Sequence, residues 1–212
     1  MRYLTEAETH VPAPVRSPRY WLGFAILKVM GWRVEGRLPN ARKYVVIAAP
    51  HTSNWDTLIM ISVSYVMGVR LSFLMKDSMF RWPFGAFFRW LGGTPVDRSS
   101  PHNTVEQCIQ KIGEVDEMAL SIAPEGTRSR VRYWKTGFYY IALGAGVPVA
   151  LGFLDYRRRV GGLGPIVIPS GDLRADLAEM QKFFASIQGK HPHLSGDLQL
   201  PEGEEPPRSA VS

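Results

Sequence analysis

Cysteine is almost absent from this sequence, since Cys108 is the single one among 212 residues. One thiol excludes a disulfide within the chain and a cysteine-rich metal site, and a reducing, cytoplasmic setting is expected. No stretch reaches the ~20 apolar residues that a membrane-spanning helix needs. No apolar run like that of a secretory signal opens the chain. We therefore expect the protein to lie on a membrane, if it meets one, rather than to cross it.

The composition is that of one folded domain with a basic surface. Hydrophobic residues make up 45% and charged residues 21% of the chain, and 212 residues can bury a sizeable core. The formal net charge is +6. A basic surface can face nucleic acid, anionic lipid or anionic small substrates, and charge alone does not choose among these partners.

The chain divides by composition into three parts. Residues 1–19 are polar and interrupted by prolines, which predicts a flexible arm. Residues 189–212 are rich in proline and glutamate, which predicts a disordered tail. The folded domain spans 20–188 and opens with a short helix over 20–32, whose aromatic and basic residues suit either a membrane surface or the core. The aromatic, basic segment 80–91 leaves the same two alternatives open.

Between these ends, apolar strands alternate with helices. Buried strands are expected over 44–49, 71–75, 94–96, 118–123, 147–155 and 165–168. Helices are expected over 56–67, 103–115, 137–145 and 173–187. This alternation predicts an α/β fold with a single domain, in which helices flank a mixed and largely parallel sheet.

His51 and Asp56 are the first candidates for chemistry. They lie five positions apart, so on one regular helix they would not share a face. They can meet if His51 lies in the loop after Pro50 and Asp56 lies in the first turn of the next helix, where an acid is favourable. The carboxylate would then fix one ring nitrogen and leave the other free as a base. The plainer alternative is a loop histidine and a helix-capping acid.

Polar residues also follow three other expected strands. They are Lys76, the pair Asp97 and Arg98, and the run Glu125, Gly126, Thr127 and Arg128. Ligands of a parallel α/β sheet bind at the carboxyl ends of its strands, so these groups are expected to converge with His51. Two arginines favour an anionic ligand such as a phosphate. Ion pairs of the arginines with the neighbouring acids are the alternative.

In this order, the motifs resemble those of the glycerolipid acyltransferases, which include the lysophosphatidic acid acyltransferases. The chain has His-Thr-Ser-Asn-Trp-Asp at 51–56, Gly-Gly-Thr-Pro-Val-Asp-Arg at 92–98, Pro-Glu-Gly-Thr-Arg-Ser at 124–129 and Val-Pro-Val at 147–149. The family pattern is H-x4-D, G-x-x-F-I-D-R, F-P-E-G-T-R-S and a V-P-V-type strand. Pro95 and Ala123 stand where that pattern has aromatic residues.

The resemblance implies a glycerol-3-phosphate-acyltransferase-like fold over 20–188, with a short N-terminal interfacial helix. It implies that His51 is the general base and Asp56 its orienting acid in O-acyl transfer from a thioester to a hydroxyl, without an acyl-enzyme. Amides near the start of the helix after His51 would stabilise the oxyanion. The residues implied to bind the acceptor are Lys76, Gly92, Asp97, Arg98, Glu125, Gly126, Thr127 and Arg128.

The implied reaction makes phosphatidic acid from 1-acylglycerol-3-phosphate without a cofactor or metal, and acyl-CoA or acyl carrier protein supplies the acyl group. The implied partners are the lysophospholipid, the donor and an anionic membrane surface, with no nucleic acid. The enzyme would be peripheral on the cytoplasmic face. Alternatives are the same chemistry on glycerol-3-phosphate, a lyso-aminolipid or a glycolipid, a hydrolase that releases fatty acid, and a non-catalytic domain that binds anionic lipid.

Overall fold

The computed structural model describes residues 1–13, 16–90, 92–96, 101–127, 130–131 and 133–194. The strands are β1 (Arg2–Tyr3), β2 (Thr9–His10), β3 (Arg33–Gly36), β4 (Leu38–Pro39), β5 (Lys43–Ala49), β6 (Leu71–Lys76), β7 (Gly93–Val96), β8 (Met118–Ile122), β9 (Val149–Asp155) and β10 (Val160–Ile168). The helices are α1 (Pro18–Met30), α2 (Asn54–Val66), α3 (Gly85–Trp90), α4 (Pro101–Glu114), α5 (Gly137–Ala145) and α6 (Leu173–Phe184). Short 3-10 helices are η1 (Glu6–Glu8), η2 (Asp77–Phe80) and η3 (Pro192–Leu194).

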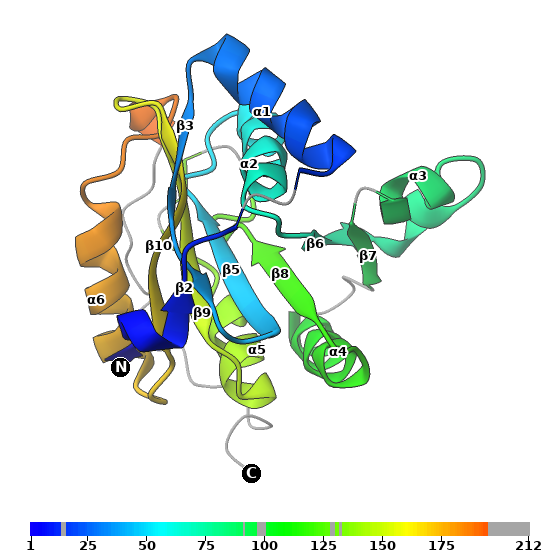
Figure 1. The fold of residues 1–212 in the computed structure, drawn as a ribbon. Helices are drawn as coiled ribbons and strands as arrows, with labels where there is room; N and C mark the ends of the chain where they lie inside the picture. The colour runs from blue at the N-terminus through cyan, green and yellow to red at the C-terminus, as the bar shows by residue number, and fades with distance from the viewer. Residues whose placement is uncertain (14–15, 91, 97–100, 128–129, 132, 195–212) are drawn as a thin grey trace.

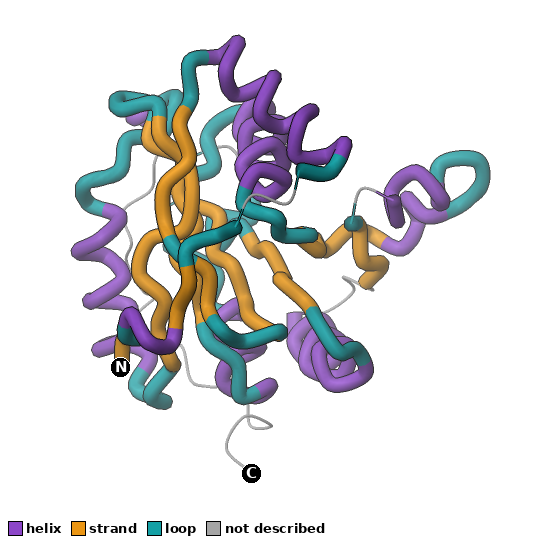
Figure 2. Tube along the Cα trace, in the orientation of Figure 1, coloured by secondary structure: helices purple, strands orange, loops and turns teal. Residues whose placement is uncertain are grey.

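One mixed sheet organises the molecule (Figure 1, Figure 2). Its parallel part has the strand order β9-β5-β8-β6-β7. β10 pairs antiparallel with β9 and with β1, and parallel with β3. The prediction of a single α/β domain with a largely parallel mixed sheet is therefore confirmed.

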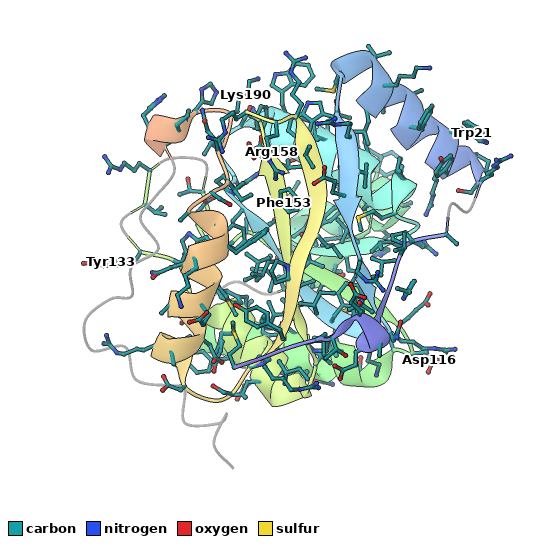
Figure 3. All side chains as sticks on the ribbon, turned by 60° about the vertical axis from the view of Figure 1, so that its left-hand side comes forward. Trp21, Asp116, Tyr133, Phe153, Arg158 and Lys190 are labelled. Carbon is teal, nitrogen blue, oxygen red and sulfur yellow. The ribbon has the colours of Figure 1, made fainter. Side chains whose placement is uncertain are left out.

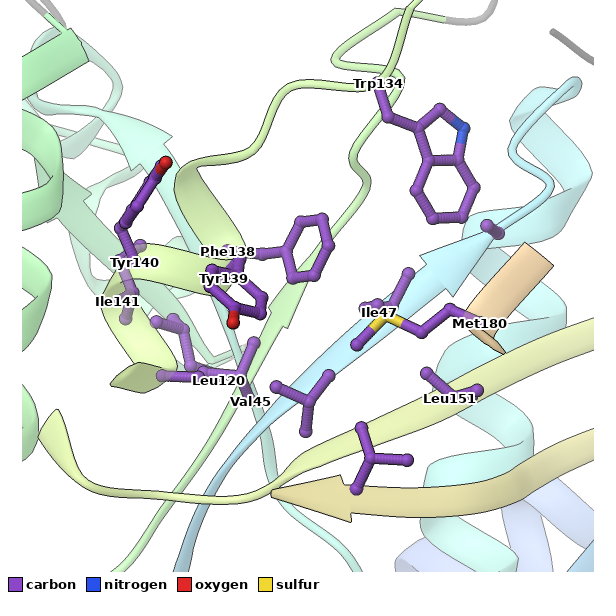
Figure 4. Packing of buried hydrophobic residues seen from close by; sticks show 14 of the residues in the cluster. Val45, Ile47, Leu120, Trp134, Phe138, Tyr139, Tyr140, Ile141, Leu151 and Met180 are labelled. Atoms are coloured by element: carbon purple, nitrogen blue, oxygen red, sulfur yellow. The ribbon is translucent and has the colours of Figure 1, made fainter. Parts of the chain in front are cut away.

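Helices cover both faces of this sheet, because successive residues of a strand point to opposite faces. Val45 and Ile47 of β5 point into a core that they share with α4, α5 and α6 (Figure 4). Tyr44 and Val46, which alternate with them, point into a second core with α1 and α2. The central strands are thus buried on both sides, which explains why their sequences are almost continuously apolar.

The first ten residues pair with the folded body, which differs from the flexible arm expected over 1–19. β1 extends the sheet beyond β10, with Arg2 opposite Ile168. β2 pairs with β4 in a small second sheet. α1 begins at Pro18, two residues earlier than expected, with Ser17 as its N-cap. Strands of two residues have no periodicity of their own and are fixed by distant partners, so the sequence does not reveal them.

The beginning of the predicted tail also lies against the folded body. Residues 189–194 continue from the segment after α6 and end in η3. Gly189 is buried, and a Cβ at this position would lie 3.0 Å from Pro50 and 3.1 Å from the hydroxyl of Thr52. The remaining part of the predicted tail, 195–212, lies outside the described residues.

β10 is longer than expected because it runs through a glycine-rich stretch. A Cβ on Gly162 would lie 1.7 Å from the carbonyl oxygen of Glu35. A Cβ on Gly36 would lie 2.0 Å from the carbonyl oxygen of Leu163. Only glycine lets β3 and β10 approach this closely, so these glycines belong to a strand pair rather than to a turn.

Candidate active site

The loop between β5 and α2 carries the first candidate pair. His51 lies in this loop after Pro50, as expected, and not on the helix. Ser53 caps α2, and its hydroxyl accepts the amide N–H of Trp55. The carboxylate of Asp56 accepts the amide N–H of Ser53 and so completes a capping box. The unpaired amides of a helix start thus bring Asp56 back toward the loop.

His51 and Asp56 face each other across this turn. Nδ1 of His51 lies 3.4 Å from Oδ2 of Asp56, and Asp56 is 2% exposed. The same oxygen accepts the amide N–H groups of Thr52 and Ser53, each at 2.8 Å. With Nδ1 turned toward the carboxylate, Nε2 is the ring nitrogen that can take a proton from a substrate.

The carboxylate of Asp56 stays charged despite its burial. Burial alone raises its pKa, but hydrogen bonds from His51, Tyr156, Ser53 and Thr52 outweigh this effect, and the pKa lies below its ordinary value. A charged carboxylate can orient the imidazole and stabilise the imidazolium that forms when His51 accepts a proton.

Tyr156 is part of this site, and sequence reasoning missed it. Its hydroxyl donates to Oδ1 of Asp56 at 2.6 Å. Its ring lies edge-on to Trp32, with 4.8 Å between ring centroids. Burial and the Asp56 carboxylate raise the pKa of Tyr156, so the hydroxyl keeps its proton and remains a donor. The available signal was its position directly after β9, at a carboxyl strand end like the other candidates.

Glu125 supports the loop rather than facing outward. It follows β8 and is 5% exposed, and its Oε2 accepts the amide N–H of His51 at 2.7 Å. Burial raises the pKa of Glu125 to about 7, although the bond from the His51 amide acts in the opposite direction. The structure therefore brings Glu125 together with His51, but through the backbone of the loop.

The other predicted site residues do not all lie at the carboxyl edge of the sheet. Gly126 and Thr127 lie in an exposed turn after Glu125. Lys76 ends β6, at the carboxyl edge of the sheet as expected. Gly92 precedes β7 at the opposite, amino edge, where a Cβ would lie 2.1 Å from the carbonyl oxygen of Leu71, so packing explains this glycine. Asp97, Arg98 and Arg128 lie outside the described residues.

The amides expected to stabilise an oxyanion are already engaged. Those of Thr52 and Ser53 donate to Asp56, that of His51 donates to Glu125, and that of Trp55 donates to Ser53. These four groups therefore shape the loop instead of pointing at a substrate. The expectation is wrong for them, because the helix start uses its own side chains as caps.

A short C-terminal segment, residues 188–194, lies across the same loop. The carbonyl oxygen of Gln188 accepts the amide N–H of Tyr156 at 2.9 Å, and the amide of His191 donates to the hydroxyl of Thr52 at 3.2 Å. The ammonium of Lys190 lies 5.3 Å from the ring centroid of Trp55. The segment thus contacts both the loop that carries His51 and the tyrosine that bonds Asp56.

An apolar cavity of about 50 Å³ opens beside the pair, between α2 and the sheet. His51 and Asp56 line it at the carboxyl end of β5. Its walls are otherwise mostly aliphatic and come from α2, β5, β9 and β10, and include Met60, Val63 and Leu154. A narrow apolar hollow of this kind suits a slender alkyl group better than a polar one. Among the residues that the structure describes, no group of three His, Cys, Asp or Glu is placed to hold a metal ion.

Comparison with known proteins identifies the family. The model of the family named Acyltransferase matches residues 32–150, which is more than half of the chain. The chain belongs to this family. The acyltransferase match includes His51, Asp56 and Glu125 but ends before Tyr156 and before the segment 188–194.

Named relatives and a solved structure agree with this assignment. A 1-acyl-sn-glycerol-3-phosphate acyltransferase of Haemophilus influenzae is 31% identical over 148 residues, which cover 65% of this chain and 60% of that protein. The protein of that name from Escherichia coli is 28% identical over 149 residues, with 63% and 59% covered. The chain thus spans about three fifths of the length of these relatives. The crystal structure of the 1-acyl-sn-glycerophosphate acyltransferase PlsC from Thermotoga maritima shares the acyltransferase fold, with a TM-score of 0.55, 20% identity, and 81% and 80% of the two chains covered.

Proposed function

We propose that this chain transfers a fatty acyl group from a thioester donor to the hydroxyl of a lysophospholipid, and that it converts 1-acylglycerol-3-phosphate into phosphatidic acid. The observation that carries the proposal is the His51–Asp56 pair at an apolar cavity in a member of the acyltransferase family. The names of the relatives support the choice of acceptor.

In the proposed reaction, Nε2 of His51 takes the proton of the acceptor hydroxyl while its oxygen attacks the thioester carbonyl carbon. The carbon–sulfur bond then breaks, the new ester forms, and the leaving thiolate takes the proton back from His51. General-base catalysis of this kind contributes about 10²–10⁴-fold. Asp56 fixes the tautomer of His51, and Tyr156 fixes Asp56. Because the acceptor hydroxyl attacks the thioester directly, no acyl-enzyme is required, and Ser53 serves as the helix cap.

The apolar cavity supports binding of the acyl chain beside the thioester, because its walls offer alkyl contacts next to His51. Arg98 and Arg128 are proposed to hold the acceptor phosphate with forked donors. The remaining proposed acceptor residues are Lys76, Asp97, Gly126 and Thr127. Acyl-CoA or acyl carrier protein is the proposed donor, and no cofactor or metal takes part.

We place the enzyme on the cytoplasmic face of an anionic membrane, since both proposed lipid substrates reside in bilayers. In the part of the chain that the structure describes, no helix has the length and apolar character to cross a membrane. α1, the expected interfacial helix, exposes Trp21, Leu22, Phe24 and Val29. Exposed aromatic and aliphatic side chains on one helix support contact with the headgroup zone.

A donor-by-acceptor matrix with the purified chain tests this proposal. Acyl-CoA and acyl carrier protein donors of several chain lengths are combined with 1-acylglycerol-3-phosphate, glycerol-3-phosphate, a lyso-aminolipid and water as acceptors. We expect phosphatidic acid to form faster than the product of any other acceptor. A faster product from another acceptor would replace the acceptor assignment, and free fatty acid as the main product would indicate a hydrolase.

A further inference from the structure

A second hollow lies at the other edge of the sheet from His51. It is a groove of about 520 Å³ at the amino ends of β5, β6, β7 and β8, where Tyr44, Leu71, Gly93 and Met118 line it. His51 and Asp56 do not line this groove.

The groove is strongly basic. Arg19, Arg42, Arg70 and Arg89 line it, and Glu117 is the single acid among its described lining residues. Of these, Arg42, Arg70 and Arg89 are exposed and form no ion pair within the described part of the chain. Four positive charges against one negative charge favour an anionic occupant.

Aromatic rings hold two of these guanidinium groups in place. Arg19 of α1 lies over the ring of Tyr65, with 5.8 Å to the ring centroid. Arg89 of α3 lies over the ring of Phe80, with 5.6 Å to the centroid. Stacking on Phe80 restricts the guanidinium of Arg89, so less entropy is lost when this side chain binds an anion.

The two elements that supply Arg19 and Arg89 form two borders of the groove, and exposed aromatic side chains lie on or next to these elements. α1, which supplies Arg19, exposes Trp21 (51%), and this side chain points away from the body (Figure 3). α3 supplies Arg89 to the groove, and the segment before α3 exposes Trp82 (94%) and Phe84 (62%). α3 projects from the body beyond β7 (Figure 1). Large rings at both borders of a basic groove suit the boundary between lipid headgroups and acyl chains.

We propose that this groove and its two aromatic borders form a docking site for anionic lipid headgroups at the surface of a bilayer. Charge complementarity selects the headgroup phosphates, and exposed Trp82 and Phe84 favour a bilayer over an acidic protein as the partner. The groove also adjoins the apolar cavity, because Ser64, Val69 and Leu71 line both. The choice of a bilayer rests on the proposed lipid substrates, but the binding itself does not depend on catalysis.

Vesicle flotation without substrate tests the docking site. The full chain is mixed with phosphatidylcholine vesicles that either contain or lack phosphatidylglycerol. The test variant combines Arg42→Gln and Arg70→Gln, and the control combines Arg174→Gln and Lys182→Gln on α6, which packs on the opposite face of the sheet. Each arginine near an anionic surface contributes about fivefold to binding, so the test variant should lose roughly 25-fold.

Three results decide the proposal. It is supported if the test variant loses binding to anionic vesicles while the control keeps it, and if Trp82→Ala weakens binding to both kinds of vesicle. It is overturned if the test variant and the control bind anionic vesicles equally. It is also overturned if the test variant keeps vesicle binding but loses binding to an acidic acyl carrier protein.

Two further measurements separate a loss of docking from a loss of folding or of catalysis. Equal thermal unfolding of both double variants and the parent chain establishes that folding is unchanged. Turnover of a short-chain, water-soluble donor and acceptor should be the same in all three. A chain that binds vesicles as expected but shows no acyl transfer would sink the proposed function and leave the docking site standing.

Discussion

At the scale of single residues, the two oxygens of Asp56 divide their partners between them. Oδ2 lies beside His51 and accepts the amides of Thr52 and Ser53, whereas Oδ1 accepts the hydroxyl of Tyr156. The amides belong to the same loop, so they fix the carboxylate relative to its own helix. Tyr156 directly follows β9, so its bond ties Asp56 to the carboxyl end of that strand.

Removing the hydroxyl of Tyr156 should therefore disturb catalysis more than folding. Tyr156→Phe keeps the ring against Trp32 but takes one donor from the buried carboxylate. A hydrogen bond to a charged group contributes about 1.5–3 kcal/mol, so we expect kcat to fall about tenfold with little change in KM. Steady-state kinetics over a range of pH measures this.

Tyr139→Phe is the matched control, because the hydroxyl of Tyr139 on α5 also donates to a buried carboxylate, that of Asp176, and neither residue lines the cavity or the groove. It should leave kcat and its pH profile unchanged. If Tyr156→Phe behaves like this control, Tyr156 plays no part in positioning Asp56.

The raised pKa of Glu125 leads to a second prediction at the scale of single residues. The folded state holds this proton up to about pH 7, whereas the unfolded chain releases it near 4.5. The folded state thus binds more protons in this window, and the free energy of unfolding falls as pH rises from 4.5 to 7. The loss amounts to about 3 kcal/mol.

Glu125→Gln removes this titration and keeps an oxygen that can accept the His51 amide. We expect the free energy of unfolding to depend less on pH in this variant, and to exceed that of the parent at pH 8. Urea unfolding at pH 5 and pH 8 measures both, with Glu114→Gln as an exposed control. The same pH dependence in Glu125→Gln and the parent would contradict the assignment.

At the scale of elements, sequence patterns predicted the units with strong local signals. The central strands are buried on both faces, so their sequences are apolar runs. Pro50 interrupts one such run, which predicted that His51 lies in a loop. The first strand, Tyr156 and the segment 188–194 were missed because their partners are distant in the sequence: β1 pairs with β10, and His191 bonds Thr52. No local periodicity reports such contacts.

The prediction at the scale of elements concerns the segment 188–194. Gly189→Ala places a methyl group 3.0 Å from Pro50 and 3.1 Å from Thr52, so the segment or the loop that carries His51 must shift. We expect a several-fold loss of kcat with modest loss of stability. Gly113→Ala is the matched control, since nothing lies within 4 Å of its Cβ and alanine favours a helix by up to about 1 kcal/mol.

Steady-state kinetics and urea unfolding of the two alanine variants separate a local from a general effect. Gly113→Ala should keep full activity and gain a little stability. Equal activity of Gly189→Ala and the parent would show that the segment only covers the loop.

At the scale of the whole molecule, the two edges of the sheet carry the two proposed sites. Its carboxyl edge carries His51, Asp56, Glu125 and Tyr156, and its amino edge carries the arginine-lined groove. Helices α1 and α2 cover the face between them, and the apolar cavity under α2 adjoins the groove. This layout connects a proposed lipid surface to the proposed base through an apolar interior.

Thioester consumption by the His51→Ala variant tests the central claim most directly. The purified variant and the parent chain are given the same acyl thioester and 1-acylglycerol-3-phosphate, and thiol release and phosphatidic acid are measured together with thermal unfolding. The account predicts that the variant unfolds like the parent but forms product at least about 10²-fold more slowly, because the general base is gone. Product formation at the parental rate by folded His51→Ala would contradict it.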